Sequence, residues 1–124
     1  RGLSNAELRI RNEKLKAKQQ VIERVFTLAK TKLENLSEDE FANYLTNTLK
    51  SIDLQDHSVL IVPDKFRQRV ISLSLPLIVS QNETVESGFL IKGDGVILNY
   101  NFNSLVDYYR DELETEIAQS LFKE

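Results

Sequence analysis

Residues 4–41 read SNAELRIRNEKLKAKQQVIERVFTLAKTKLENLSEDEF, and this stretch decides the fold. It contains no Pro or Gly before Leu36, and Leu8, Leu15 and Ile22 recur in it at intervals of seven residues. Such spacing predicts one long α-helix. In the first half of that helix the apolar column stands almost alone among charged side chains, so it is too narrow to be buried in a globular core. We therefore expect this half to project from the body and to pair with a partner helix through Leu8, Leu15 and Ile22.

The second half of the same helix has a wider apolar stripe. Val25, Phe26 and Leu33 join it, as expected where a helix docks onto its own domain. The alternative for the first half is that Leu8 and Ile10 fray in solvent, or pair only in a crystal. We favour a partner helix, because a heptad spacing kept over several turns is typical of coiled association.

A second helix follows directly. Ser37 can cap the backbone N–H of Glu40, while the Glu40 side chain can reach back to the Ser37 N–H, which is the pattern of a capping box. The helix is predicted to run to about Ser51. Its buried face is predicted from apolar residues at three-to-four spacing, including Phe41, Leu45 and Leu49.

The middle of the chain predicts a small sheet of about four strands, mostly antiparallel, with one short helix. A β-branched run is stopped by Pro63, and Asp64 can cap the short helix that comes next. Later, Gly93-Asp94-Gly95 separates two apolar runs, which is a strong hairpin signal. The expected segments are strand 59–62, helix 65–73, strand 77–79 and hairpin 88–100.

The last helix begins near Asn101 or Asn103, since either can cap it. One face is predicted to close the core, and it carries Phe102, Val106, Tyr109, Leu113, Ile117 and Leu121. The other face is acidic. The expected fold is therefore α+β, with a long projecting helix over residues 1–36, a globular domain over 37–124, and an amphipathic helix at the C-terminal end.

Charge is distributed unevenly along the chain. Residues 1–36 carry nine Lys/Arg and four Asp/Glu, whereas residues 37–124 carry seven and fifteen. A basic helix of this kind could bind RNA or a ribosome, and we keep an RNA- or ribosome-associated adaptor as the alternative function. The position of the tyrosines that could stack on bases argues against this alternative, because they lie in the acidic part of the chain. We therefore do not expect a nucleic acid as a partner.

The sequence predicts no enzyme active site. Gly93-x-Gly95 lies between two strands, whereas a phosphate-binding loop is followed by a helix. His57 is the only histidine and there is no cysteine, so a metal site lacks its usual ligands. We expect no catalytic residue, no metal and no cofactor.

The order of elements resembles that of the C-terminal part of the E subunit of the V-type (A/V-type) ATPases and ATP synthases. Four sequence features resemble this family more specifically than the order of elements does. They are Lys18-Gln19-Gln20-Val21-Ile22, Val25-Phe26 with Ala29, the hairpin opening at Gly88, and the ending EIAQSLF over residues 116–122. The resemblance covers nearly the whole chain.

The resemblance implies a noncatalytic peripheral-stalk (stator) subunit of a rotary ATPase that couples ATP to proton or sodium transport. It implies pairing with a helical stalk subunit, called G or H, and contact with the catalytic head, mainly its B subunit. The candidate head contacts are Phe89, Ile91, Tyr108, Glu112 and Glu116. As an isolated fragment, the chain is also expected to be able to form a homodimer.

The chain has no initiator Met and opens within a helical pattern, so we expect it to be part of a longer protein. The resemblance implies that the missing N-terminal part reaches the membrane sector. No apolar run approaches the roughly 20 residues needed to cross a bilayer. The expected location is cytoplasmic, at the periphery of a membrane-bound complex.

Overall fold

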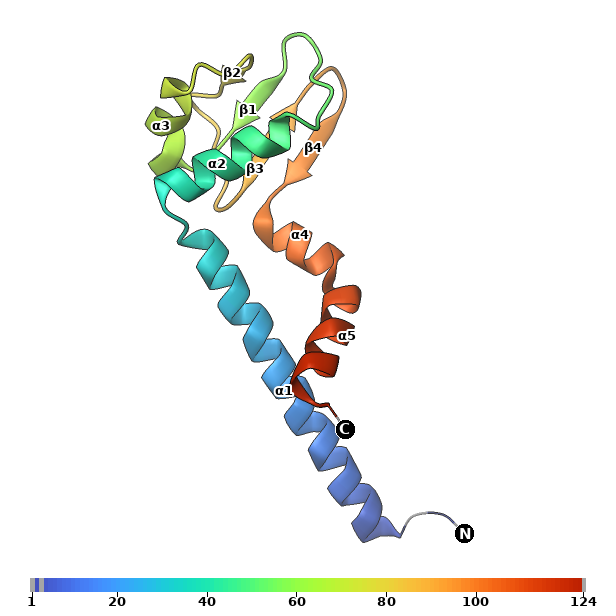
Figure 1. Cartoon of the computed structure of the whole chain (residues 1–124). Helices are drawn as coiled ribbons and strands as arrows, with labels where there is room; N and C mark the ends of the chain where they lie inside the picture. The colour runs from blue at the N-terminus through green and yellow to red at the C-terminus, as the bar shows by residue number, and fades with distance from the viewer. Residues whose placement is uncertain (1, 3, 124) are drawn as a thin grey trace.

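The computed structural model describes residues 2 and 4–123, and their fold is α+β, as predicted (Figure 1). A body of helices and one sheet lies at one end of the molecule, and a long helix extends from it. The N-terminus lies at the far tip of this helix. The helices are α1 (Asn5–Glu34), α2 (Glu38–Leu49), η1 (Asp64–Phe66), α3 (Arg67–Ser72), α4 (Phe102–Tyr108) and α5 (Arg110–Leu121).

The sheet has four strands in the order β2-β1-β3-β4, and it is mixed, with antiparallel pairing between β1 and β3 and between β3 and β4. Only β1 and β2 are parallel, which the α3 crossover between them permits. The strands are β1 (Val59–Ile61), β2 (Ile78–Val79), β3 (Phe89–Lys92) and β4 (Ile97–Tyr100). The Gly93–Val96 loop makes the predicted hairpin turn, with the Gly93 N–H donating to the Val96 carbonyl at 2.9 Å.

The junction between α1 and α2 is short and fully capped. Ser37 accepts from the Glu40 N–H at 3.1 Å, and the Glu40 carboxylate accepts from the Ser37 N–H at 3.1 Å, which confirms the predicted capping box. At the end of α1, Lys65 Nζ donates to the Glu34 carbonyl at 2.6 Å. Because α1 ends at Glu34 and α2 begins at Glu38, few residues are left to act as a hinge.

The core lies between α2 and one face of the sheet. Phe41 stacks on Phe66 with ring centroids 4.5 Å apart, and Phe89 stacks on Tyr100 at 4.9 Å. The cluster of buried residues comprises Phe41, Leu45, Leu49, Leu60, Val62, Phe66, Val70, Phe89 and Ile91. The predicted inner face of α2 is therefore confirmed.

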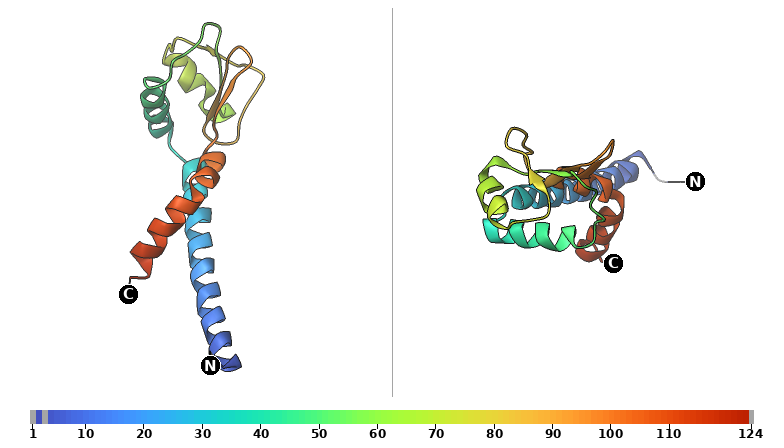
Figure 2. Two further views of the ribbon diagram at one scale, coloured as in Figure 1. Left: turned by 90° about the vertical axis from the view of Figure 1, so that its right-hand side faces the viewer. Right: turned by 90° about the horizontal axis from the view of Figure 1, so that it is seen from above.

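The C-terminal helix differs from the prediction in two ways. It is broken at Tyr109 into α4 and α5, and it runs back along α1 instead of closing the core (Figures 1 and 2). Phe102 alone among its predicted inner residues is buried, and its ring stacks on Tyr44 at 5.2 Å. The physical reason is competition for apolar surface, because α2 already covers the sheet whereas Ile22 and Phe26 of α1 still need covering.

A smaller correction concerns Asp64. It does not cap a helix, since no side-chain hydrogen bond closes that end. It begins the 3₁₀ turn η1 and forms an ion pair with Arg67. Arg67 in turn donates to the carbonyls of Ser80 and Glu83, which fixes the segment between β2 and β3.

Candidate partner-binding surfaces

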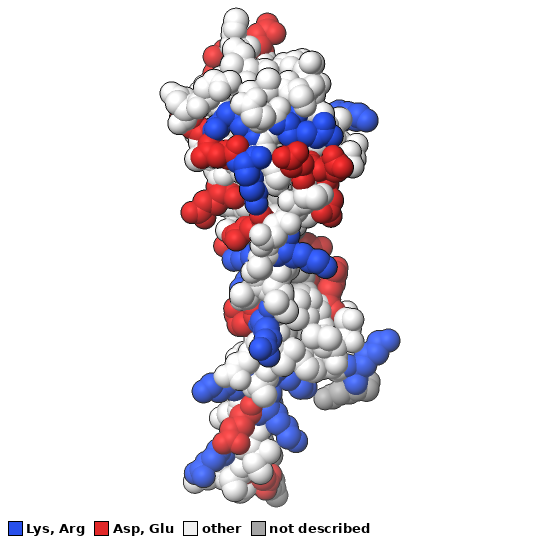
Figure 3. All heavy atoms as spheres, turned by 90° about the vertical axis from the view of Figure 1, so that its left-hand side faces the viewer, with Lys and Arg blue, Asp and Glu red and all other residues white. Residues whose placement is uncertain are grey.

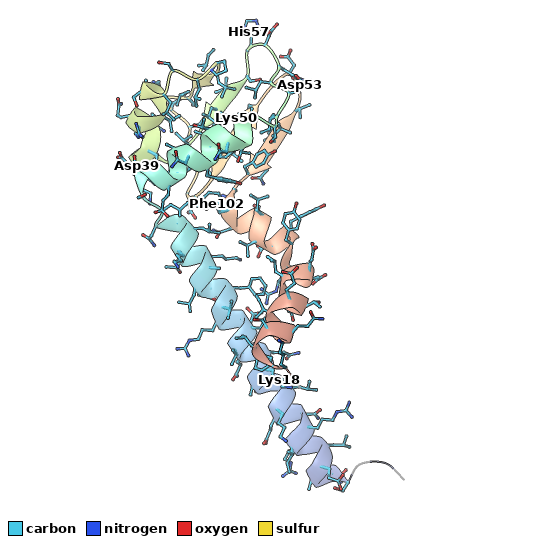
Figure 4. The ribbon with its side chains drawn as sticks, in the orientation of Figure 1. Lys18, Asp39, Lys50, Asp53, His57 and Phe102 are labelled. Carbon is cyan, nitrogen blue, oxygen red and sulfur yellow. The ribbon has the colours of Figure 1, made fainter. Side chains whose placement is uncertain are left out.

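The N-terminal half of α1 extends beyond the rest of the molecule. The C-terminal end of α5 reaches α1 near Lys18, whose Nζ lies 5.4 Å from the centroid of the Phe122 ring (Figure 4). Between Asn5 and Ala17 every side chain of α1 is exposed. Leu8 is 40% exposed and Leu15 is 50% exposed. Two of the three predicted contacts with a partner helix therefore lie on an open surface.

Ile22, the third predicted contact, is buried within the chain. It is 6% exposed and Phe26, one turn further on, is 3% exposed, because α4 and α5 cover this part of α1. Ile22 thus has almost no surface left for a partner. The sequence pattern could not show this, because the covering helices lie far away along the chain.

Arg110 holds α5 against α1. Its guanidinium lies 4.6 Å from the centroid of the Phe26 ring, and it forms ion pairs with Glu23 of α1 and with Glu114 of its own helix. Lys30 of α1 and Asp107 of α4 form a second link, at 2.7 Å, which holds the preceding helix against α1. Cation–π contacts and partly exposed ion pairs are each modest in energy, so this docking is weaker than a packed core. Sequence analysis missed Arg110, since its partner ring lies 84 positions away.

Basic side chains surround the exposed half of α1. Figure 3 shows Lys and Arg distributed along this part of the molecule, with few acidic groups between them. The sequence places Arg9, Arg11, Lys14, Lys16 and Lys18 there, against Glu7 and Glu13. A partner helix with acidic side chains would complement this surface.

The body offers a second surface, a groove of about 460 Å³ between β4 and α4. Its apolar walls include Ile97, 61% exposed, and Tyr108, 78% exposed. β4 is an edge strand, so its outer backbone groups are open to pairing. Sequence analysis did not select Ile97, although an apolar residue on the outward face of a hairpin strand was the available signal.

The predicted head contacts separate into two groups. Tyr108 lines the groove, and Glu112 and Glu116 are exposed on α5. Phe89 and Ile91 are 0% and 2% exposed and face the core, so the structure does not place them on a surface. The reason is the alternation along β3, which turns these two side chains towards α2.

The remaining candidates for chemistry do not assemble into a site. His57 is exposed in a turn with φ of 64°. Within residues 2 and 4–123, no three His, Asp or Glu side chains come together in a group that could hold a metal ion. In the same part of the chain, no helix combines the length and the apolar composition that a membrane crossing requires.

Comparison with known proteins identifies the family. Residues 1–62 match the family described as ATP synthase (E/31 kDa) subunit. The V-type proton ATPase E subunit of Finegoldia magna is 42% identical over 99% of this chain and 66% of that protein. The V-type proton ATPase E subunit of Clostridium botulinum is 38% identical over 98% of this chain and 69% of that protein.

A third relative, the V-type ATP synthase E subunit of Fusobacterium nucleatum, is 30% identical over 98% of this chain and 66% of that protein. The chain therefore spans about two thirds of the length of these relatives. The resemblance inferred from the residues is confirmed. The chain belongs to the ATP synthase (E/31 kDa) subunit family, which includes the E subunits of the V-type ATPases.

Proposed function

We propose that this chain is part of a peripheral-stalk (stator) subunit of a V-type rotary ATPase or ATP synthase. In this role it links the catalytic head to the membrane sector and resists torque during ATP-coupled ion transport, without itself catalysing a reaction. One observation carries the proposal. α1 projects from a packed body as a continuous helix of 30 residues, and its outer half is exposed, basic and partly apolar.

Pairing of α1 with a second helical stalk subunit follows from that observation. An exposed helix with a narrow apolar face gains stability when another helix covers that face. Leu8 and Leu15 belong to the exposed half, and the basic side chains around them favour an acidic partner. The partner in this proposal is the stalk subunit called G or H.

The body would contact the catalytic head, mainly its B subunit. The β4–α4 groove supports this part of the proposal, since it combines exposed apolar side chains with an open strand edge. Of the candidate head contacts, Tyr108 lines this groove, and Glu112 and Glu116 are exposed acidic groups on the following helix, α5. In this arrangement the protein is cytoplasmic and peripheral to the membrane.

Affinity purification from the native organism tests the proposal. A tag on the full-length protein should recover a small helical stalk subunit together with the ATPase head subunits, at both moderate and high salt. Recovery of RNA at moderate salt, lost at high salt and without ATPase subunits, would contradict the stator role and support the RNA adaptor, because phosphate contacts weaken steeply with salt.

A further inference from the structure

Besides the column of Leu8 and Leu15, α1 carries a second column of apolar side chains, and these side chains remain exposed to solvent. Ile10 is 54% exposed, Val21 is 43% exposed and Leu28 is 62% exposed, and Ala17 is also exposed. These four residues, here named the outer stripe, follow one another at intervals of seven, four and seven. Single exposed apolar residues are ordinary on a protein surface, but a column at heptad spacing is a helix-pairing pattern.

The outer stripe lies on nearly the opposite side of α1 from α5. At about 100° per residue, its four members fall within roughly 40° of one another, and roughly 145° from the column of Leu8, Leu15, Ile22 and Phe26. At 1.5 Å per residue the outer stripe is roughly 27 Å long. The burial values agree with this geometry, since Val21 and Leu28 stay exposed in the segment where Ile22 and Phe26 are covered.

The two columns differ in how far a partner helix could follow them. Along the column of Leu8 and Leu15, such a helix would meet the end of α5 at Phe122, next to Lys18. Along the outer stripe it could continue to Leu28, because α5 lies on the other side of α1. Heptad pairing becomes favourable when it is sustained over several turns, so the longer column is the better seam.

Two cations complete the heptad pattern of the outer stripe and determine what can cover it. Lys14 and Arg24 are exposed and fill the gaps, so that residues 10, 14, 17, 21, 24 and 28 alternate at intervals of four and three. A polar or charged residue at such a position selects the partner and the register.

A second copy of the chain fits this seam poorly. In a parallel pair in register, each of the two cations would face the same residue of the second chain. In an antiparallel pair centred on residue 19, Lys14 of each chain would face Arg24 of the other. Both arrangements place like charges face to face, which is destabilising. The occupant that fits is a different helix, amphipathic, with carboxylates about ten positions apart opposite the two cations.

We propose that the partner helix of the stalk lies along the outer stripe, in place of the column of Leu8 and Leu15, and that its carboxylates face Lys14 and Arg24. This inference rests on the proposed function. α1 would then be the middle layer, with α5 on one side and the partner helix on the other.

Thiol labelling in the assembled ATPase tests which column is used. The chain has no cysteine, so Leu28→Cys and Leu15→Cys can report on the two columns from similar exposure. Each variant is made in the full-length protein on a background without other reactive cysteines, and its labelling rate with a maleimide is compared between the isolated protein and the assembled complex. We expect labelling at Leu28→Cys to slow about tenfold on assembly, while Leu15→Cys changes by less than about twofold.

This experiment distinguishes failure of the outer-stripe assignment from failure of the proposed function. Slower labelling of Leu15→Cys alone, or of both variants equally, would overturn the choice of stripe and leave the stalk proposal standing. No slowing at either position would overturn the inference and also count against helix pairing, and therefore against the proposed function.

A charge reversal tests the occupant's chemistry. Lys14→Glu/Arg24→Glu should reduce recovery of the partner helix about tenfold or more, because it places carboxylates against carboxylates. Lys50→Glu/Lys123→Glu is the matched control, since it makes the same change in net charge at exposed positions outside α1. Far-UV circular dichroism checks that both variants remain helical. Equal recovery of the partner by the two variants would contradict the assignment of Lys14 and Arg24.

Discussion

Gly88 and Gly95 share a backbone φ of +70° but have different surroundings. A Cβ at Gly88 would overlap with the Tyr100 carbonyl oxygen, whereas nothing lies within 4 Å of a Cβ at Gly95. Gly88→Ala should therefore destabilise the chain by about 2 to 4 kcal/mol, because it adds a backbone clash to the strain of a positive φ. Urea unfolding followed by circular dichroism measures this difference.

Gly95→Ala is the control for that prediction. It carries the same backbone strain without the clash, so its cost should be about 1 to 2 kcal/mol. Equal destabilisation by the two substitutions would mean that the close approach between Gly88 and Tyr100 is not a real constraint.

Glu40 should make the capping box sensitive to pH. The Ser37 backbone N–H, and then the Ser37 side chain, hydrogen-bond to its carboxylate and lower the pKa of Glu40 below its ordinary value. Because the folded-state pKa lies below the unfolded-state pKa, the stabilising effect is complete above the unfolded-state pKa and is lost as the pH falls through the folded-state pKa. We expect Glu40→Gln to lower the unfolding midpoint at neutral pH, and the difference from the parent protein to vanish in acid.

Thermal unfolding between neutral and acidic pH measures this effect. Glu38→Gln serves as the control, because it removes a charge from the same first turn of α2. If both variants showed the same pH dependence, the effect would come from the helix dipole and not from the hydrogen bonds with Ser37.

Local features at this scale were predictable from sequence, while burial was less so. The capping box and the turn at Gly93-Asp94-Gly95 depend on residues within a few positions of one another, and both were predicted correctly. The environments of Ile22, Phe89 and Ile91 depend on distant segments. These three were expected at interfaces, and all three are buried within the chain.

At the scale of elements, α5 is the segment most open to detachment. None of its residues is buried, and its docking on α1 relies on Arg110 and a few half-buried apolar side chains. Arg110→Ala should weaken this docking by about 1 kcal/mol, or about fivefold in the opening equilibrium, since it removes a cation–π contact and partly exposed ion pairs. Amide hydrogen exchange in α5 should speed up accordingly.

Arg9→Ala is the matched control for this prediction, because Arg9 lies on the part of α1 beyond α5. Exchange in α2 should stay unchanged in both variants. Unchanged exchange in α5 of Arg110→Ala would show that the apolar contacts alone hold α5 in place.

The list of elements was predictable, but the position of the last two helices was not. Apolar spacing and turn residues predicted the long helix, α2, the hairpin and an amphipathic C-terminal helix. An amphipathic pattern predicts that the apolar face of a helix is covered, but it does not identify the element that covers it. This face is predicted to close the core, whereas α4 and α5 lie against α1.

At the scale of the whole molecule, the β4–α4 groove is the proposed contact with the ATPase head. Tyr108→Asp/Ile97→Asp should weaken binding of the protein to purified head by about 2 kcal/mol or more, because it places charges on exposed apolar anchors. Surface-immobilised head can measure this affinity. The unfolding midpoint should hardly change, since neither side chain belongs to the core.

Gln68→Asp is the control for the groove. It adds an exposed charge on α3, on the other side of the body from β4 (Figure 1). Loss of head binding in this control, with none in the groove variant, would move the head contact to the α3 side.

The way α4 and α5 lie along α1 has a mechanical consequence. A load applied sideways at the free end of a rod fixed at the other end produces a bending moment that grows towards the fixed end. Here the rod is a single helix at its tip and a layer of paired helices near the body, where Lys65 and the capping box fix its end. The molecule is thus built as a tapered cantilever, thickest where bending would be greatest.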